Sequence, residues 1–123
     1  GSHTVAHRRL TTLSAEDLTT ELTQSRAHLA DVLGAPPRSL AYPYGDFDAR
    51  IEEATQAAGY TQACTTQSGW SMREPAPFRR RRLTIFNHDT PSSFARKLYF
   101  GDNEAGWLRT ADHVAKRLVK RFS

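Results

Sequence analysis

The sequence predicts an α/β fold, in which short buried strands alternate with amphipathic helices. Three observations predict it: leucines at helical spacing between residues 15 and 33, an apolar run at 39–42 that ends in Pro-Tyr-Gly, and a second apolar run at 60–65. Strands that alternate with helices form parallel sheets covered by crossover helices. Because the three strands predicted in all would leave a sheet edge bare, we expect the chain to be part of a larger α/β unit.

The first predicted helix spans about 15–33. Ser14 is a favourable N-cap, and the acidic pair Glu16 and Asp17 suits the first turn of a helix. Gly34 stands where a C-cap is expected, and two prolines after it prevent the helix from continuing. The stripe predicted to face the core consists of Leu18, Leu22, Leu29 and Leu33.

Cap and turn residues set the bounds of the later elements. Asp48 and Gly59 cap a second helix, and Pro91 and Gly101 enclose a third. Apolar residues on one side of the last segment predict an amphipathic helix that packs on the core. The later elements are, in chain order, a strand at 39–42, a helix at 49–58, a strand at 60–65, a strand at 82–86, and helices at 91–100 and about 104–122.

The composition is that of a globular protein with one core. The 123 residues are 38% hydrophobic and 24% charged, so we expect a single partial domain over 1–123. No apolar run is long enough to cross a bilayer, and no signal peptide is visible. The single cysteine, Cys64, excludes an intramolecular disulfide and a zinc site built from several cysteines.

Basic residues gather in two places and give a net charge of +4. One block is Arg79–Arg82, and the other lies near the end of the chain. Such a surface could meet nucleic acid, anionic lipid or an acidic glycan, but a solvated face is the favoured interpretation. No nucleic-acid-binding motif accompanies the charge, so we expect no nucleic-acid partner.

A histidine pair at the start of the chain is a candidate metal site. His3 and His7 are four residues apart in Gly-Ser-His-Thr-Val-Ala-His. Two imidazoles at short spacing can converge on one ion, which is the usual basis of zinc sites. Two surface histidines, or the remnant of a cloning sequence, are the alternatives that the spacing alone leaves open.

The turn Pro43-Tyr44-Gly45 is a second candidate site. It follows a predicted strand, and the carboxyl edge of a parallel sheet is where α/β proteins build their active sites. Glycine lets a backbone approach a ligand closely, and a free backbone N–H there could stabilise an oxyanion. An ordinary strand-to-helix turn is the alternative.

In this order the two features resemble the polysaccharide deacetylase family, the NodB-homology group of carbohydrate esterases. The family's second motif, H-[ST]-x-x-H, stands here as His3-Thr4-Val5-Ala6-His7, and its third motif ends in P-[YF]-G, here Pro43-Tyr44-Gly45. The resemblance covers about residues 1–90 and favours His3 as a native residue. It implies part of a distorted (β/α) barrel whose N-terminal strands are missing from this chain.

The resemblance also implies roles for these residues. His3 and His7 match the histidines that bind a divalent metal, usually Zn²⁺. Tyr44 matches the catalytic residue whose backbone N–H holds the oxyanion, and Pro43 and Gly45 belong to the same substrate-binding turn. The family's first motif supplies a third ligand and the general base from two aspartates upstream, which we expect to be absent here. Where the family often has an arginine that orients the base, this chain has Ala41.

His88 is a further candidate. Ile85-Phe86-Asn87-His88 has the spacing of the family's last motif, whose histidine acts as the general acid. A histidine suits that role because its unperturbed pKa lies near neutrality. The preceding Arg79–Arg82 block does not resemble the usual lead-in, so a loop histidine beside Asp89 is the alternative.

The expected function is metal-dependent hydrolysis of acetyl groups, N-acetyl favoured, from an acetylated glycan. The isolated chain is expected to be inactive without the upstream aspartates. The competing hypothesis is a truncated or degenerate domain that serves as a glycan-binding or scaffold module. By family analogy the glycan belongs to the cell envelope or the extracellular space, and the sequence does not indicate an oligomeric state.

Overall fold

The computed structural model describes residues 1–71, 76–104, 106, 108 and 111–112. The chain forms two compact units. The first consists of Gly1–Gln67 with Ser71–Arg82, and the second of Ser68–Trp70 with Leu83–Ser123. The expectation of one partial domain over 1–123 stays a prediction.

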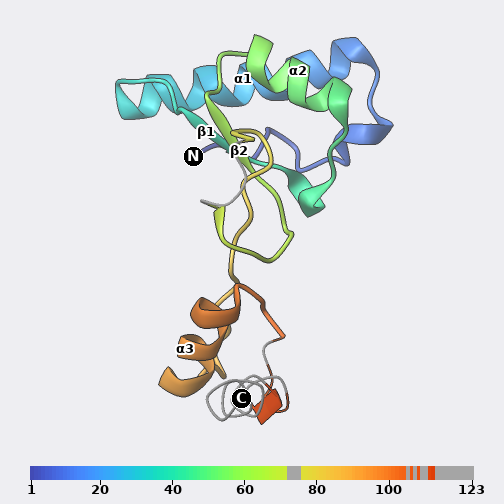
Figure 1. Ribbon diagram of the computed structural model, residues 1–123. Coiled ribbons are helices and arrows are strands. Elements are labelled where there is room, and N and C mark those ends of the chain that lie inside the picture. Colours follow the sequence, from blue (N-terminus) through green and yellow to red (C-terminus); the bar gives the residue numbers. More distant parts are fainter. Residues whose placement is uncertain (72–75, 105, 107, 109–110, 113–123) are drawn as a thin grey trace. The chain divides into compact units, whose positions relative to one another are not determined.

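The first unit is built on a small parallel sheet (Figure 1). Strand β1 (Ser39–Ala41) pairs in parallel with β2 (Gln62–Cys64), and Leu40 lies opposite Ala63. Single-residue bridges extend the sheet on both sides, from Ser2 to Leu40 and from Arg80 to Cys64, again in parallel. Four chain segments therefore end at the same edge of the sheet. The α/β class is confirmed.

The strand predicted at 82–86 is wrong. The chain pairs with β2 two residues earlier, where the Arg80 N–H donates to the Ala63 carbonyl and the Thr65 N–H donates to the Arg80 carbonyl. The Arg82 N–H donates to the Gln67 carbonyl, and at Thr84 and Phe86 side chains accept the backbone hydrogen bonds. The Thr84 N–H donates to the Asn103 side chain and the Phe86 N–H to the Asp89 carboxylate, so this segment has no sheet partner among the described residues.

Helix α1 (Ala15–Leu33) has the predicted ends. The Ser14 hydroxyl accepts a hydrogen bond from the Asp17 N–H, and Gly34 caps the helix in the left-handed conformation with a φ of 73°. Only the N-terminal half of the leucine stripe is buried, since Leu33 is 64% exposed. The buried face continues instead through polar residues, Glu21 and Ser25.

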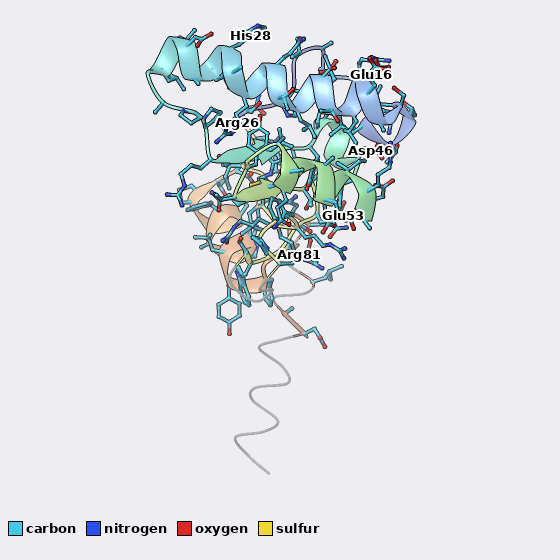
Figure 2. The ribbon with its side chains drawn as sticks, turned by 90° about the horizontal axis from the view of Figure 1, so that it is seen from above. Glu16, Arg26, His28, Asp46, Glu53 and Arg81 are labelled. Atoms are coloured by element: carbon cyan, nitrogen blue, oxygen red, sulfur yellow. The ribbon has the colours of Figure 1, made fainter. Side chains whose placement is uncertain are left out.

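Helix α2 (Ala49–Ala57) begins at the predicted cap, with the Asp48 side chain accepting a hydrogen bond from the Ile51 N–H. It lies beside α1 next to the strands (Figure 1). From α1, Arg26 points toward Gly59 and the Tyr60 ring, where α2 leads into β2 (Figure 2). The buried apolar residues between helices and sheet are Leu10, Leu13, Leu18, Leu22, Leu40, Tyr42, Ile51, Tyr60 and Ala63.

The second unit centres on helix α3 (Pro91–Phe100), which matches the predicted span. Thr90 forms a capping box with Ser93, and Gly101 ends the helix in the left-handed conformation. The helix predicted over about 104–122 falls largely outside the described residues. None of the described helices is both long enough and apolar enough to span a membrane.

A buried ion pair joins α3 to the turn before it. The Lys97 ammonium donates to the Asp89 carboxylate at 2.5 Å and to the Thr84 carbonyl at 3.0 Å. The side chains of Lys97 and Asp89 are only 6% and 5% exposed. The hydrogen bond from Lys97, together with those from the Phe86 N–H and the Ser93 hydroxyl, holds the pKa of the Asp89 carboxyl well below its usual range.

This lowered pKa predicts acid sensitivity of the second unit. The stability that Asp89 contributes is fully present above about pH 4, the ordinary aspartate pKa in an unfolded chain, and is lost as the pH falls below that value. Asp89→Asn should therefore reduce the protection of α3 amides from hydrogen exchange at pH 7, and its difference from the wild type should shrink toward pH 2. Asp31→Asn, which removes an exposed carboxylate from α1, is the control. Equal α3 protection in the wild type and Asp89→Asn at pH 7 would contradict the prediction.

Candidate active site at the carboxyl edge of the sheet

The segment that carries both histidines is held to α1 by a buried carboxylate. One oxygen of Glu21, Oε2, accepts hydrogen bonds from the Val5 N–H at 2.9 Å and from the Ala6 N–H at 3.0 Å. Glu21 is 7% exposed, so these bonds replace the water that the charge loses on burial. These hydrogen bonds restrain the backbone of the loop between His3 and His7, which follows the sheet segment at Ser2.

The two histidine rings lie together, as the sequence predicted. Their centroids are 4.7 Å apart, with 66° between the ring planes. The His3 Nδ1 lies 2.7 Å from the Ala41 carbonyl oxygen at the end of β1. That contact requires the proton on Nδ1, because a carbonyl only accepts, and it leaves the Nε2 lone pair of His3 available.

The separation of the two rings is close to that expected in a zinc site. A zinc ion about 2 Å from one nitrogen of each imidazole would bring the ring centroids to about 5 Å from each other. A backbone carbonyl on the distal nitrogen is the usual partner that fixes the tautomer of a metal-binding histidine. The described residues contain no group of three or more side chains that could hold a metal ion, and a catalytic zinc needs about three protein ligands.

The turn after β1 takes a strained conformation. Pro43–Gly45 forms a short 3-10 turn (η2) in which Tyr44 has a φ of 58°. The N–H groups of Gly45 and Asp46 donate to the Tyr42 and Pro43 carbonyls, whereas the Tyr44 N–H has no acceptor among the described residues. Gly45 is required because a Cβ there would collide with the Thr66 side chain. A close turn with one free N–H is the geometry that oxyanion stabilisation needs.

Backbone strain is concentrated at this edge. The non-glycine residues with positive φ among the described residues are Thr4, His7 and Tyr44, at 65°, 54° and 58°. Each such residue costs on the order of 1 kcal/mol and persists only where the surrounding structure fixes it. Such strain clusters at functional sites, so its position supports the assignment of this edge as the candidate site.

Ring contacts connect the turn to the histidines. The Tyr44 ring lies edge-on to the His7 ring, with centroids 4.6 Å apart. The Arg9 guanidinium carbon lies 4.7 Å from the centre of the Tyr44 ring, a cation–π contact. Tyr44 is 56% exposed, so these groups line an open surface beside the histidines.

His88 lies in the second unit. It is exposed, and its ring stacks on Phe86 with centroids 5.3 Å apart and planes 4° from parallel. It borders a groove of about 550 Å³ that is also lined by Asp89, Lys97 and Asn103. The general-acid role of His88 stays a prediction.

Sequence reasoning missed three contributors to the site. Glu21 carried no predicted role, although an acidic residue between buried leucines signals a buried polar contact. Arg9 lacked any pattern signal. Arg82, assigned to a strand, instead donates from Nε to the Thr65 carbonyl at 2.8 Å, just beyond β2.

Comparisons with known proteins match the part of the chain that contains these residues. The family model described as polysaccharide deacetylase matches residues 1–63, which include both histidines and the Pro-Tyr-Gly turn. Chitin deacetylase 1 of Cryptococcus neoformans var. grubii is 36% identical over 64 residues, which are 52% of this chain and 14% of that protein. The matched part of the sequence therefore contains the candidate site.

Solved structures of deacetylases match a larger part of the chain. The Streptococcus pyogenes deacetylase PplD, in complex with acetate, is 26% identical with a TM-score of 0.70, and the match covers 76% of this chain and 41% of PplD. The polysaccharide deacetylase BC0361 from Bacillus cereus is 28% identical with a TM-score of 0.67, over 76% of this chain and 29% of BC0361. The chain thus spans less than half of each of these relatives.

The contact between Glu21 and the histidine loop predicts a stability effect. Glu21→Ala should lower the free energy of unfolding by roughly 2–4 kcal/mol, because it removes a buried charged acceptor and leaves the Val5 and Ala6 N–H groups without their hydrogen bonds. Glu21→Gln should cost about half as much, since its amide oxygen can still accept. Urea denaturation measures both. Glu53→Ala on the exposed side of α2 (Figure 2) is the control, expected within about 0.5 kcal/mol of the wild type. Equal effects of Glu21→Ala and Glu53→Ala would show that the contact does not hold the loop.

Proposed function

The chain belongs to the polysaccharide deacetylase family, and from that premise we propose that its first unit forms part of a site that hydrolyses acetyl groups on a glycan. N-acetyl groups are the favoured substrate. The observation that carries the proposal is the convergence of His3 and His7 beside the strained Tyr44 turn. The whole site would lie in a distorted (β/α) barrel, of which this chain would form one part.

We propose that His3 and His7 bind a divalent metal, with Zn²⁺ the best match to two imidazoles. When bound, such an ion supplies Lewis-acid activation of the acetyl carbonyl and of the water that attacks it. The Ala41 carbonyl fixes the His3 tautomer through Nδ1, which keeps Nε2 as the binding atom. A third protein ligand and a general base would have to come from outside the described residues.

The turn would bind the reacting acetyl group. The free N–H of Tyr44 would donate to the carbonyl oxygen as negative charge develops on it, and it needs no rearrangement because η2 already holds it in place. Pro43 and Gly45 shape the turn so that a substrate can approach the backbone. His88 would protonate the leaving amine, a role for which an imidazole is chemically suited.

A second candidate function is glycan binding without catalysis. It is favoured by one observation, namely that the described residues contain no group of three or more side chains that could hold a metal ion. A chain of this kind would hold a metal weakly and serve as a binding or scaffold module. The two candidates differ in whether the intact protein releases acetate.

Metal binding is tested directly by zinc titration. His3→Ala and His7→Ala should each lower the zinc affinity of the chain by at least about tenfold, because each removes one of two ligands. Competition with a chromophoric chelator measures the affinity. His28→Ala is the matched control, since His28 is exposed on α1 (Figure 2) and should leave zinc binding unchanged. An unchanged affinity in His3→Ala, or an equal loss in His28→Ala, would refute the site.

Catalysis is tested by acetate release. The isolated chain, supplied with zinc, should release little or no acetate from chitin oligomers or peptidoglycan, because its described residues lack a third ligand and a carboxylate base beside the histidines. A protein that contains the missing groups should release acetate, and His3→Ala should abolish that activity. Turnover by the isolated chain that disappears in His3→Ala would show instead that this chain holds the whole site.

A further inference from the structure

Arg9 differs from Arg8, Arg50 and Arg79 of the first unit, each of which has a polar partner. Arg8 pairs with Asp17 at 3.5 Å, Arg79 pairs with Glu52, and Arg50 donates to backbone carbonyls around η1 (Leu10–Thr12). The exposed guanidinium of Arg9 contacts the Tyr44 ring and has no carboxylate partner among the described residues. Its hydrogen-bond donors are therefore available to a ligand.

The position of Arg9 relates it to the proposed reaction centre. Its guanidinium lies over the Tyr44 ring at 4.7 Å, and the Tyr44 ring contacts the His7 ring at 4.6 Å. One aromatic ring thus separates the cation from a proposed metal ligand. A sugar whose acetyl group reached the Tyr44 N–H would place its neighbouring substituents near Arg9.

The acidic groups of this edge are already engaged. The Asp46 carboxylate accepts two hydrogen bonds from Thr11, from its N–H at 3.2 Å and from its hydroxyl at 2.5 Å. Glu21 is buried against the histidine loop. Arg82 adds a second exposed guanidinium beyond β2, and it too has no carboxylate partner among the described residues. Among the described residues, Arg9 and Arg82 thus place two guanidinium groups without a carboxylate partner at this edge.

We propose that the glycan bound at this edge carries an oxyanion, a carboxylate or a phosphate, close to the acetylated sugar, and that Arg9 binds it. A guanidinium binds such groups through two parallel charge-assisted hydrogen bonds, and the Tyr44 ring restrains it in position. This inference rests on the proposed function, because it places the anion beside the acetyl group. A neutral polymer would leave the donors of Arg9 to water and gain nothing from its charge.

Binding of matched oligosaccharides tests the inference. Chitin hexasaccharide is neutral, hyaluronan hexasaccharide alternates the same N-acetylglucosamine with a carboxylate sugar, and a phosphorylated chitin hexasaccharide carries phosphate instead. The chain should bind an anionic hexasaccharide about tenfold more tightly than the neutral one in isothermal titration calorimetry. Whichever anionic oligomer shows the larger Arg9-dependent preference identifies the oxyanion.

Neighbouring arginines provide the matched comparison. Arg9→Gln should reduce the anionic preference to less than about twofold and leave chitin binding unchanged, whereas Arg9→Lys should retain part of it. Arg8→Gln removes the same charge one residue away, from a side chain paired with Asp17, and should keep the preference. Equal losses in Arg8→Gln and Arg9→Gln would reveal only diffuse charge attraction, and either that result or equal affinities for all three oligomers would overturn the inference.

The experiments distinguish a failure of this inference from a failure of the proposed function. If the anionic preference survives Arg9→Gln while His3→Ala still removes zinc, the inference fails and the deacetylase site stands. If the preference depends on Arg9 but His3→Ala leaves the zinc affinity unchanged, the anion site stands and the metal site fails. Absence of measurable binding to every oligomer counts against the inference.

Discussion

The candidate site depends on one buried carboxylate. Glu21 projects from the middle of α1 and binds two consecutive N–H groups of the loop that separates His3 from His7. A buried charge is stable only where several donors satisfy it, and this one receives two from the segment it must hold. Without that contact, fewer hydrogen bonds would hold the segment after Ser2 beside the sheet. The histidine pair is thus positioned by a helix that contributes none of its own side chains to the proposed chemistry.

The parallel sheet supplies the second constraint. Because Ser2, β1, β2 and Arg80 pair in parallel, the residues that follow each of them emerge at one edge. The histidine loop and the turn therefore lie close together at this edge, and Thr4, His7 and Tyr44 adopt positive φ there. Strain of this kind would be removed by glycine or by a looser loop if only stability were at stake. Its presence in three side-chain-bearing residues fits a surface shaped for a ligand.

Much of the fold and part of the candidate site could be predicted from the sequence. The features that could not be predicted depend on contacts between residues distant in sequence. Helix ends followed local rules, so the caps at Ser14, Gly34 and Asp48 were correct. The prediction of a strand at 82–86 failed because apolar alternation does not reveal whether a neighbouring strand is present. The side chains of Asn103 and Asp89 accept hydrogen bonds from N–H groups of this segment instead. The histidine pair was found through its spacing. Glu21 and Arg9 act through contacts that are distant in sequence or unpatterned, which no local rule detects.

The contact at Ala41 is made by the main chain and not by the side chain. The side chain at this position differs from the arginine often found in the family, yet the backbone carbonyl of the same residue holds the His3 Nδ1. A main-chain acceptor is independent of the side chain, so the tautomer of His3 survives the substitution. Arg9 and Arg82 place guanidinium groups at the same edge from other segments of the described chain, so positive charge is present there without an arginine at position 41.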